Sequence, residues 1–243
     1  MKKFGLIGYP LTHSFSPRYF AEKFEREGIE NSEYRLYEIP DIEDVKPLLS
    51  GSIAGLNVTI PYKEVIMPFI DELDDDAAEI GAINTIKIVK ECTKGYNTDI
   101  YGFEHALIEL IGDAKPKAAL ILGTGGAAKA VKFVLNKMGI DYMTVSRNNG
   151  DLIYNDLDKS IIENHKLIIN TTPLGTYPNI KSKPNIPYAN LTPDHFLFDL
   201  TYNPSVTAFM SEGLSNGAKT LNGLRMLELQ AEKSWEIWNQ QDS

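Results

Sequence analysis

The chain is poor in the residue types that build disulfides and metal centres. Its 243 residues include one cysteine, Cys92, and four histidines. A single cysteine forms no internal disulfide, and a zinc cluster needs more thiol and imidazole ligands than these scattered residues supply. We therefore expect no metal site, and the cysteine usage gives no sign of an oxidising compartment.

Long apolar runs are missing as well. No window approaches the roughly 18 uninterrupted apolar residues of a membrane-spanning helix. The apolar run that follows Met1-Lys2-Lys3 ends at Ile7, too early for the core of a secretory signal. We expect a soluble, cytoplasmic protein with no membrane partner.

Positive charge is scarce too, since 24 lysines and arginines stand against 33 acidic residues, giving a net charge of −9. This balance disfavours nucleic acid as a partner, because phosphate backbones are bound mainly through clustered cations. What is present is an ordinary globular composition, 43% apolar and 23% charged, which excludes disorder. At roughly 150 residues per domain, the length suggests two domains.

Short apolar runs alternate with segments of helical period, a pattern typical of parallel strands joined by crossover helices. In the first half we predict strands over 4–8, 34–39 and 54–58, helices over 17–27, 41–49, 61–70 and 74–80, and an antiparallel hairpin at a sheet edge over 82–89 and 93–96. A helix over 98–111 leads to a second α/β unit, with strands over 118–122, 142–145, 167–170 and 196–200 and a helix over 127–138. The last helix, 223–238, could cover either unit.

The predicted strand 118–122 runs directly into a cluster of small residues, after which a helix begins. The cluster comprises Gly123, Thr124, Gly125, Gly126 and Ala127. A dinucleotide-binding turn has this context, because small residues let a pyrophosphate approach the amides of the helix N-terminus. We therefore expect a Rossmann-type doubly wound domain here. The alternative is a plain strand-to-helix turn, in which glycine serves only the backbone geometry.

The second strand of this unit ends in Ser146 and Arg147 rather than in a carboxylate. NAD sites usually place Asp or Glu there, where it accepts a hydrogen bond from the ribose 2′-hydroxyl. An arginine can instead pair with a 2′-phosphate in fork geometry, so the sequence favours NADP. The alternative is that Arg147 merely ends a strand in solvent.

Two serines, Ser14 and Ser16, precede Pro17 at the start of the first predicted helix. Ser16 is either only the N-cap of this helix or, with Ser14, one of two hydroxyls that seat a small carboxylate at the helix end. The two interpretations can coexist.

Asn57, Thr59 and Lys63 follow the third strand at its carboxyl end, where open α/β sheets bind ligands. Taken alone, a loop lysine is usually solvated. Asp99 could likewise be only a first-turn carboxylate near a helix N-terminus. Asn84 could be only a polar residue of the hairpin, without a role in binding.

Eight short motifs run through the chain in order. They are GYPLTHSFSP (8–17), GLNVTIPYKE (55–64), GAINTI (81–86), GYNTD (95–99), GTGGAAKA (123–130), INTTPLG (169–175), FDLTYNP (198–204) and NGLRMLELQA (222–231). Each is weak alone, but in this order the sequence resembles the shikimate dehydrogenase family almost from end to end.

The resemblance implies an enzyme that interconverts 3-dehydroshikimate and shikimate with NADP(H), on the route to chorismate and the aromatic amino acids. It implies that Lys63 is the catalytic acid/base and Asp99 its carboxylate partner. The substrate-binding residues that it implies are Ser14, Ser16, Asn57, Thr59, Lys63, Asn84, Asp99, Tyr202 and Gln230. The implied cofactor-binding residues are Gly123, Thr124, Gly125, Gly126, Ala127, Ser146, Arg147, Thr171, Leu200 and Gly223.

The resemblance also implies a fold of two α/β domains with an active-site cleft between them. Residues 1–98 and 224–243 would form a discontinuous substrate-binding catalytic domain, and residues 99–223 an NADP-binding Rossmann domain. Small-molecule substrates are the expected partners, and the protein would act as a monomer or homodimer.

Three features depart from the family pattern. Ile100 follows Asp99 where glycine is common, no second basic residue follows Arg147, and Arg225 stands where a small residue is frequent. Three alternatives stay open: a quinate/shikimate dehydrogenase with relaxed cofactor use, a dehydrogenase of another small carboxylate, and a non-catalytic sensor that keeps the site for binding.

Overall fold

The computed structural model describes the whole chain except His13, Glu91, Asp242 and Ser243. The chain divides into two compact units, of which the first comprises Met1–Tyr101 and Glu228–Ser243 and the second comprises Gly102–Leu227. Both divisions fall inside helices, α4 (Thr98–Ile111) and α8 (Leu224–Asn239), rather than at their ends. The boundaries predicted from the sequence, 98/99 and 223/224, lie a few residues earlier along the chain.

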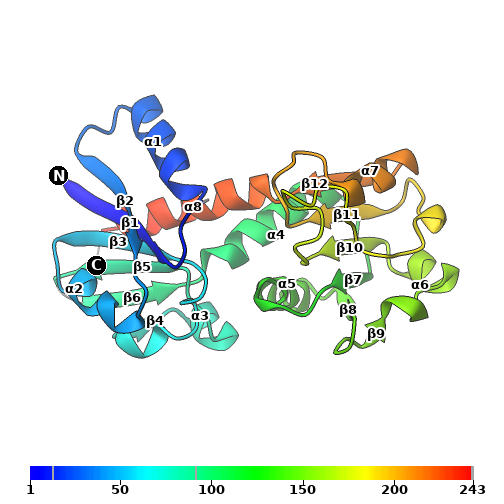
Figure 1. Ribbon diagram of the computed structural model, residues 1–243, viewed down its shortest axis with the longest axis horizontal. Coiled ribbons are helices and arrows are strands. Elements are labelled where there is room, and N and C mark those ends of the chain that lie inside the picture. The colour runs from blue at the N-terminus through cyan, green and yellow to red at the C-terminus, as the bar shows by residue number, and fades with distance from the viewer. Residues whose placement is uncertain (13, 91, 242–243) are drawn as a thin grey trace. The chain divides into compact units, whose positions relative to one another are not determined.

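The first unit contains a six-stranded mixed sheet (Figure 1). Its strands in spatial order are β2 (Ser32–Glu38), β1 (Lys2–Gly8), β3 (Ile53–Val58), β5 (Thr85–Val89), β6 (Cys92–Tyr96) and β4 (Glu72–Leu73). Strands β1, β2 and β3 pair in parallel, whereas β5 pairs antiparallel with β3 and β6. The predicted hairpin is therefore present, but its placement at the sheet edge is wrong, because β4 pairs with the outer side of β6.

The helical segments of the first unit are shorter than the sequence pattern predicts, except for the first, which begins one residue earlier and ends at the predicted residue. They are α1 (Ser16–Glu27), the 3₁₀ turn η1 (Ile42–Val45), α2 (Lys46–Leu49), the 3₁₀ turn η2 (Met67–Phe69) and α3 (Asp75–Ile80). The predicted helix over 61–70 is wrong, since only turns and η2 occupy this segment. Pro68 has no amide hydrogen for the Glu64 carbonyl and its ring opposes a continuous helix.

Helix α8 belongs to the first unit from Glu228 onward, and Trp238 in this part joins an aromatic core. The Trp238 ring stacks on Phe4 with centroids 4.9 Å apart, and its indole nitrogen donates to the Ile86 carbonyl at 3.0 Å. A Cβ on Gly55 of β3 would lie 2.3 Å from this indole, so the close approach requires glycine. Helix α8 is thereby fixed onto the sheet that carries Asn57.

The second unit contains a six-stranded sheet in which every pairing is parallel. Its spatial order is β12 (Lys219–Asn222), β11 (Phe196–Asp199), β10 (Leu167–Asn170), β7 (Ala118–Leu122), β8 (Asp141–Ser146) and β9 (Leu152–Ile153). Counted from β7, this is the order of the doubly wound dinucleotide-binding fold. The predicted architecture of two α/β units, one of them Rossmann-type, is confirmed.

Helices and 3₁₀ turns connect the strands of this sheet (Figure 1). They are α5 (Gly126–Lys137), η3 (Tyr154–Asp156), α6 (Lys159–Asn164), η4 (Tyr188–Asn190) and α7 (Ala208–Ser215). The core is formed by strand residues such as Leu120, Ile168 and Leu197, which are completely buried. Since strands buried on both faces are apolar throughout, their sequences show continuous apolar runs rather than alternation.

Candidate active site and cofactor pocket

Lys63 and Asp99 lie side by side in the first unit. Lys63 occupies the turn after β3, and this turn is held in place because the Ile83 amide donates to the Lys63 carbonyl at 2.8 Å. Asp99 lies in the first turn of α4. Lys63 Nζ is 2.6 Å from Asp99 Oδ2, and the two side chains are 33% and 18% exposed. The structure thus brings the two predicted catalytic residues together as an ion pair that solvent can still reach.

A buried network of polar side chains connects β3, β5, α4 and α8. One of its members, Thr98, directly precedes Asp99 in the sequence. Its members are Asn57, Asn84, Thr85, Thr98, Gln230 and Ser234. The Asn84 side-chain oxygen accepts hydrogen bonds from the Thr98 amide at 2.7 Å and from the Thr98 hydroxyl at 3.1 Å. The Asn84 side-chain nitrogen donates to the Gln230 oxygen at 3.5 Å. Two of the predicted substrate-binding residues, Asn84 and Gln230, are therefore in contact.

Asn57 lies at the centre of this network. Its nitrogen donates to the Asn84 carbonyl, the Thr85 hydroxyl and the Ser234 hydroxyl at 3.0–3.2 Å, and its oxygen accepts from the Tyr34 hydroxyl at 2.8 Å. Because Asn57 is 4% exposed and its polar atoms are bonded within the protein, the geometry favours a role in fixing the network. Its predicted contact with substrate stays a prediction.

The sequence did not point to Tyr34, Thr85, Thr98 or Ser234, although all four bond within this network. Thr85 and Ser234 are separated by 149 positions, and their hydroxyls are 2.8 Å apart. Threonine in a strand and serine in a helix have no periodic signal that marks them as partners. The one available hint was that polar residues interrupt otherwise apolar segments.

The segment around Ser14 and Ser16 leads into α1. Helix α1 begins at Ser16 and its N-cap residue is Phe15, so the interpretation of Ser16 as the N-cap is wrong. Ser16 is buried, and burial is also the main cause that raises the pKa of Tyr34. Ser14 is partly buried and donates to the Leu11 carbonyl at 3.1 Å. Thr59, just beyond β3, is also partly buried.

Helix α1 is attached to α8 by a cluster of three side chains. Lys23, which is almost fully buried, forms an ion pair with Glu232 at 2.7 Å. The Tyr19 hydroxyl donates to the same carboxylate, and burial together with this bond raises the Tyr19 pKa. The cluster fixes the helix that begins at Ser16 against the helix that carries Gln230.

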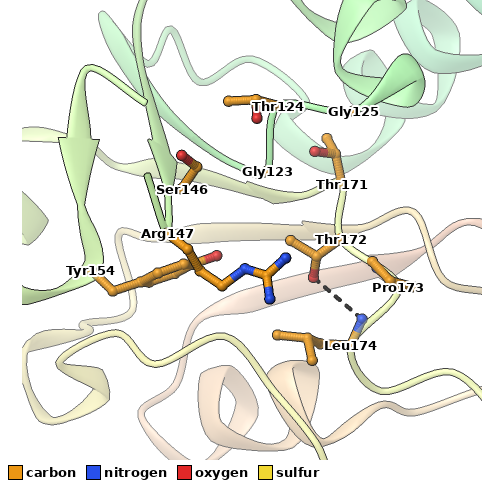
Figure 2. Close-up of a pocket in the computed structure, with 10 residues that line it drawn as sticks. All are labelled: Gly123, Thr124, Gly125, Ser146, Arg147, Tyr154, Thr171, Thr172, Pro173 and Leu174. Carbon is orange, nitrogen blue, oxygen red and sulfur yellow. Dashed lines mark hydrogen bonds between the residues drawn. The ribbon is translucent and has the colours of Figure 1, made fainter. Parts of the chain in front are cut away.

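The second unit has a pocket of about 390 Å³ at the carboxyl ends of β7, β8 and β10 (Figure 2). The residues that line it are Gly123, Thr124, Gly125, Ser146, Arg147, Tyr154, Thr171, Thr172, Pro173 and Leu174. Six of these were predicted to bind cofactor, and Arg147 is the one charged residue in the lining. The sequence did not single out Tyr154 or the segment Thr172–Leu174.

The glycine cluster leaves room beside the first turn of α5. Gly123 has a φ of 110°, and a Cβ there would lie 2.7 Å from the Thr171 hydroxyl oxygen, so this position requires glycine. At Gly125 and Gly126 an added Cβ would meet nothing within 4 Å, and Gly125 provides no side-chain cap for α5. The amides of this turn, Ala127 included, are therefore available at the positive end of the helix dipole, which suits a pyrophosphate.

The end of β8 carries the two residues predicted to recognise a 2′-phosphate. Ser146 accepts a hydrogen bond from the Asn149 amide at 2.7 Å, and Arg147 is exposed and forms no ion pair with any described residue. The nearest downstream carboxylate, Asp151, accepts from the amide and hydroxyl of Thr144, both at 2.7 Å, and these bonds lower its pKa. Asp151 therefore stabilises β8 through Thr144 and is already used as an acceptor inside the protein. Because an NAD site usually has a carboxylate that accepts from the ribose 2′-hydroxyl, this arrangement fits a site for NADP better than one for NAD.

Leu200 and Gly223 do not line this pocket, but they touch each other. A Cβ on Gly223 would lie 2.1 Å from the Leu200 carbonyl oxygen, so only glycine fits. The turn that contains Leu200 and Tyr202 is held by Asp199, which is completely buried and accepts from Thr207 at 2.6 Å and from the Thr201 amide at 3.0 Å. Burial raises the pKa of Asp199, and these hydrogen bonds oppose that effect.

Within the described part of the chain, no helix combines the length and apolar character needed to span a membrane. The same residues contain no group of three or more His, Cys, Asp or Glu side chains arranged to hold a metal ion.

The fold and the two sites define a two-unit α/β protein with a dinucleotide-type pocket in one unit and a lysine–carboxylate pair in the other. A family model described as "Shikimate dehydrogenase substrate binding domain" matches residues 6–86. A shikimate dehydrogenase (NADP(+)) of Methanococcus maripaludis is 40% identical to this chain, with 98% of this chain and 91% of the relative covered. The chain belongs to the shikimate dehydrogenase family.

Two solved structures extend the comparison. A crystal structure of a shikimate dehydrogenase in complex with NADP⁺ is 38% identical, with a TM-score of 0.84 and coverage of 98% of this chain and 90% of that one. A quinate dehydrogenase from Corynebacterium glutamicum in complex with NAD is 26% identical, with a TM-score of 0.84 and coverage of 98% and 93%.

Proposed function

We propose that this enzyme is an NADP-dependent shikimate dehydrogenase, which reversibly reduces 3-dehydroshikimate to shikimate. The observation that carries the proposal is the Lys63–Asp99 pair, with Nζ and Oδ2 2.6 Å apart. Reduction of a ketone leaves negative charge on its oxygen, and an adjacent ammonium can stabilise this charge and then supply a proton. Lys63 is an ammonium held in a fixed position and partly open to solvent, as this role requires.

In the proposed mechanism, Lys63 donates a hydrogen bond from Nζ to the ketone oxygen and then transfers the proton to it. In the reverse direction its neutral amine accepts the proton of the alcohol. Asp99 orients Lys63, because the carboxylate accepts from Nζ and is itself fixed in the first turn of α4. Bound NADPH supplies the hydride.

The remaining substrate roles are proposed from the positions of the side chains. Ser14 and Ser16 would hold the substrate carboxylate, with Tyr202 contributing its phenol. Thr59, Asn84 and Gln230 would bind ring hydroxyls, with Asn57 fixing the network behind them. The Asn84–Gln230 hydrogen bond supports this assignment, since it places two amide side chains from distant segments together.

The cofactor roles follow from the pocket of the second unit, whose residues fit NADP. The first turn of α5 offers free amides to a pyrophosphate, and Ser146 and Arg147 offer donors to a 2′-phosphate. Thr171 would line the cofactor, and Leu200 and Gly223 would border the nicotinamide. We accordingly propose the first unit as the substrate-binding catalytic domain and the second as the NADP-binding domain.

The direct test is an activity panel of shikimate and quinate, each with NADP⁺ and with NAD⁺, followed by the absorbance of the reduced nicotinamide. We expect shikimate with NADP⁺ to give the highest kcat/KM. This result would support a role in the route to chorismate and the aromatic amino acids.

Other outcomes would identify the alternatives. Comparable kcat/KM for quinate, or for NAD⁺, would indicate a quinate/shikimate dehydrogenase with relaxed cofactor use. Absence of turnover, together with a rise in Tm on addition of shikimate, would indicate a sensor.

A further inference from the structure

The cofactor pocket has one cation where the proposed function requires binding of a phosphate dianion. Among the ten residues that line the pocket, Arg147 is the only one with a positive charge. A phosphate monoester carries close to two negative charges and three strong acceptor oxygens. One guanidinium satisfies two of these oxygens in fork geometry, so a selective site needs further donors.

Tyr154 lines the same pocket beside Arg147. Figure 2 shows its ring alongside the Arg147 side chain, with the hydroxyl end turned toward the pocket. The ring packs partly against the hydrophobic core of the second unit. Its hydroxyl makes no hydrogen bond with any residue that the structure describes, and it is not a buried atom. The phenol is thus fixed at its apolar end and free to donate at its polar end.

The strand register explains why Tyr154 and Arg147 are neighbours. Strands β8 and β9 pair in parallel, with Val145 opposite Leu152 and Ser146 opposite Ile153. Arg147 and Tyr154 directly follow this last pair, and both line the pocket. Asp151 secures the connection between the strands through its bonds to Thr144.

The connecting loop itself depends on one glycine. A Cβ on Gly150 would lie 2.6–2.7 Å from the backbone atoms of Thr144, Ser146 and Leu152. Without a side chain at this position, the chain folds back closely enough to place Tyr154 at the pocket. This closeness is a consequence of the short connection between β8 and β9.

We propose that the Tyr154 hydroxyl is the second donor to the adenosine 2′-phosphate and thereby strengthens the preference for NADP over NAD. It acts beside the Arg147 guanidinium and the Ser146 hydroxyl, whose oxygen accepts from the Asn149 amide and whose proton remains to be donated. The inference rests on the proposed use of NADP and is independent of which acid is the substrate. Burial raises the pKa of Tyr154 and Arg147 opposes the effect, so the phenol stays a donor at neutral pH.

The test measures binding of two cofactor fragments, 2′,5′-ADP and 5′-AMP, to the full chain by calorimetry without any substrate. Tyr154→Phe keeps the ring and removes only the hydroxyl. We expect this variant to bind 2′,5′-ADP roughly tenfold more weakly, as for loss of a hydrogen bond to a charged group, and 5′-AMP unchanged. Arg147→Ala should show the same selectivity with a larger loss. Tyr142→Phe, on β8 but outside the pocket lining, is the matched control and should bind both fragments as the wild type does.

Three results would overturn the proposal. They are unchanged affinity of Tyr154→Phe for 2′,5′-ADP, an equal loss for both fragments, and wild-type protein that does not discriminate between the fragments. An equal loss would mean that the hydroxyl supports the part of the pocket that both fragments occupy and does not bind the 2′-phosphate. A failure of the proposed substrate would look different, because turnover with shikimate would be absent while the discrimination between the fragments persisted.

Discussion

At the scale of single residues, we expect the Lys63–Asp99 pair to contribute little to stability. Both side chains are partly exposed, and ion pairs in such positions are worth about 0–1 kcal/mol. The backbone of Lys63 is held independently of its side chain by the Ile83 amide. Removing the amine should therefore leave the turn in place.

Lys63→Ala should retain the wild-type Tm and bind shikimate with similar affinity while losing kcat by about 10²–10⁴-fold, the usual worth of a positioned proton donor. Steady-state kinetics and calorimetry with shikimate measure the two effects separately. Lys94→Ala, which removes a partly exposed lysine of the same unit, should leave both unchanged. Near-normal kcat in Lys63→Ala would remove this residue from the mechanism.

Ser234 shows the opposite balance, because it is fully buried and its hydroxyl is used entirely inside the protein. The hydroxyl accepts from Asn57 at 3.0 Å and donates to the Gln230 carbonyl at 2.9 Å. Ser234→Ala should lower the free energy of unfolding by about 1–3 kcal/mol, since Asn57 then loses a buried partner. Urea denaturation measures this loss, and an unchanged transition midpoint would show that the network tolerates the gap.

At the scale of elements, the edge formed by β8 and β9 depends on a carboxylate. Hydrogen bonds from the backbone and side chain of Thr144 hold the pKa of Asp151 below its ordinary value. A carboxylate whose pKa is lower in the folded state stabilises the fold fully above its unfolded pKa, about 3.9. This contribution is lost as pH falls through the folded pKa.

Asp151→Asn should therefore lower Tm at pH 7 by roughly 2 °C, a modest effect because the group is exposed. The difference from wild type should shrink as the pH falls below about 4. Asp141→Asn, at the exposed start of β8, serves as the control. A Tm difference that is equal at pH 7 and pH 3 would show that Asp151 does not act through its charge.

The elements themselves were predictable where local pattern and tertiary environment agree. The predicted ranges 98–111, 118–122 and 167–170 match α4, β7 and β10 at both ends. A long segment with helical periodicity and short apolar runs each leave few alternative secondary structures. The short strands β4 and β9 were missed, since two paired residues have no pattern of their own, and the short elements β12, α6 and α7 were missed as well. Part of the polar network was missed for a related reason, because Thr98 and Ser234 become partners only after α4 and α8 have packed.

Arg225 was a departure from the family pattern without an explanation at the sequence level. In the structure its guanidinium donates hydrogen bonds of 2.7–3.0 Å to the Glu109 carboxylate. These bonds connect α8 to α4 within the second unit. This hydrogen bond is also the main cause that lowers the pKa of Glu109. The arginine thus braces two helices.

At the scale of the whole molecule, the two units have separate cores and separate sites. All residues of the polar network and the Lys63–Asp99 pair belong to the first unit, and every residue that lines the cofactor pocket belongs to the second. A ligand that binds only the folded form of one unit stabilises that unit through its own binding free energy. The proposed division of labour between the units can therefore be tested by locating the protection that each ligand provides.

Hydrogen exchange followed by mass spectrometry should show that 2′,5′-ADP slows exchange around residues 123–128, 146–154 and 171–174. This fragment lacks the nicotinamide, so exchange in the first unit should stay as it is in the free protein. Shikimate should slow exchange around residues 57–63, 84–99 and 228–234, because amide opening there has to break contacts with the bound acid. Protection of 123–128 by shikimate alone, or of 57–63 by 2′,5′-ADP alone, would contradict the assignment of one ligand to each unit.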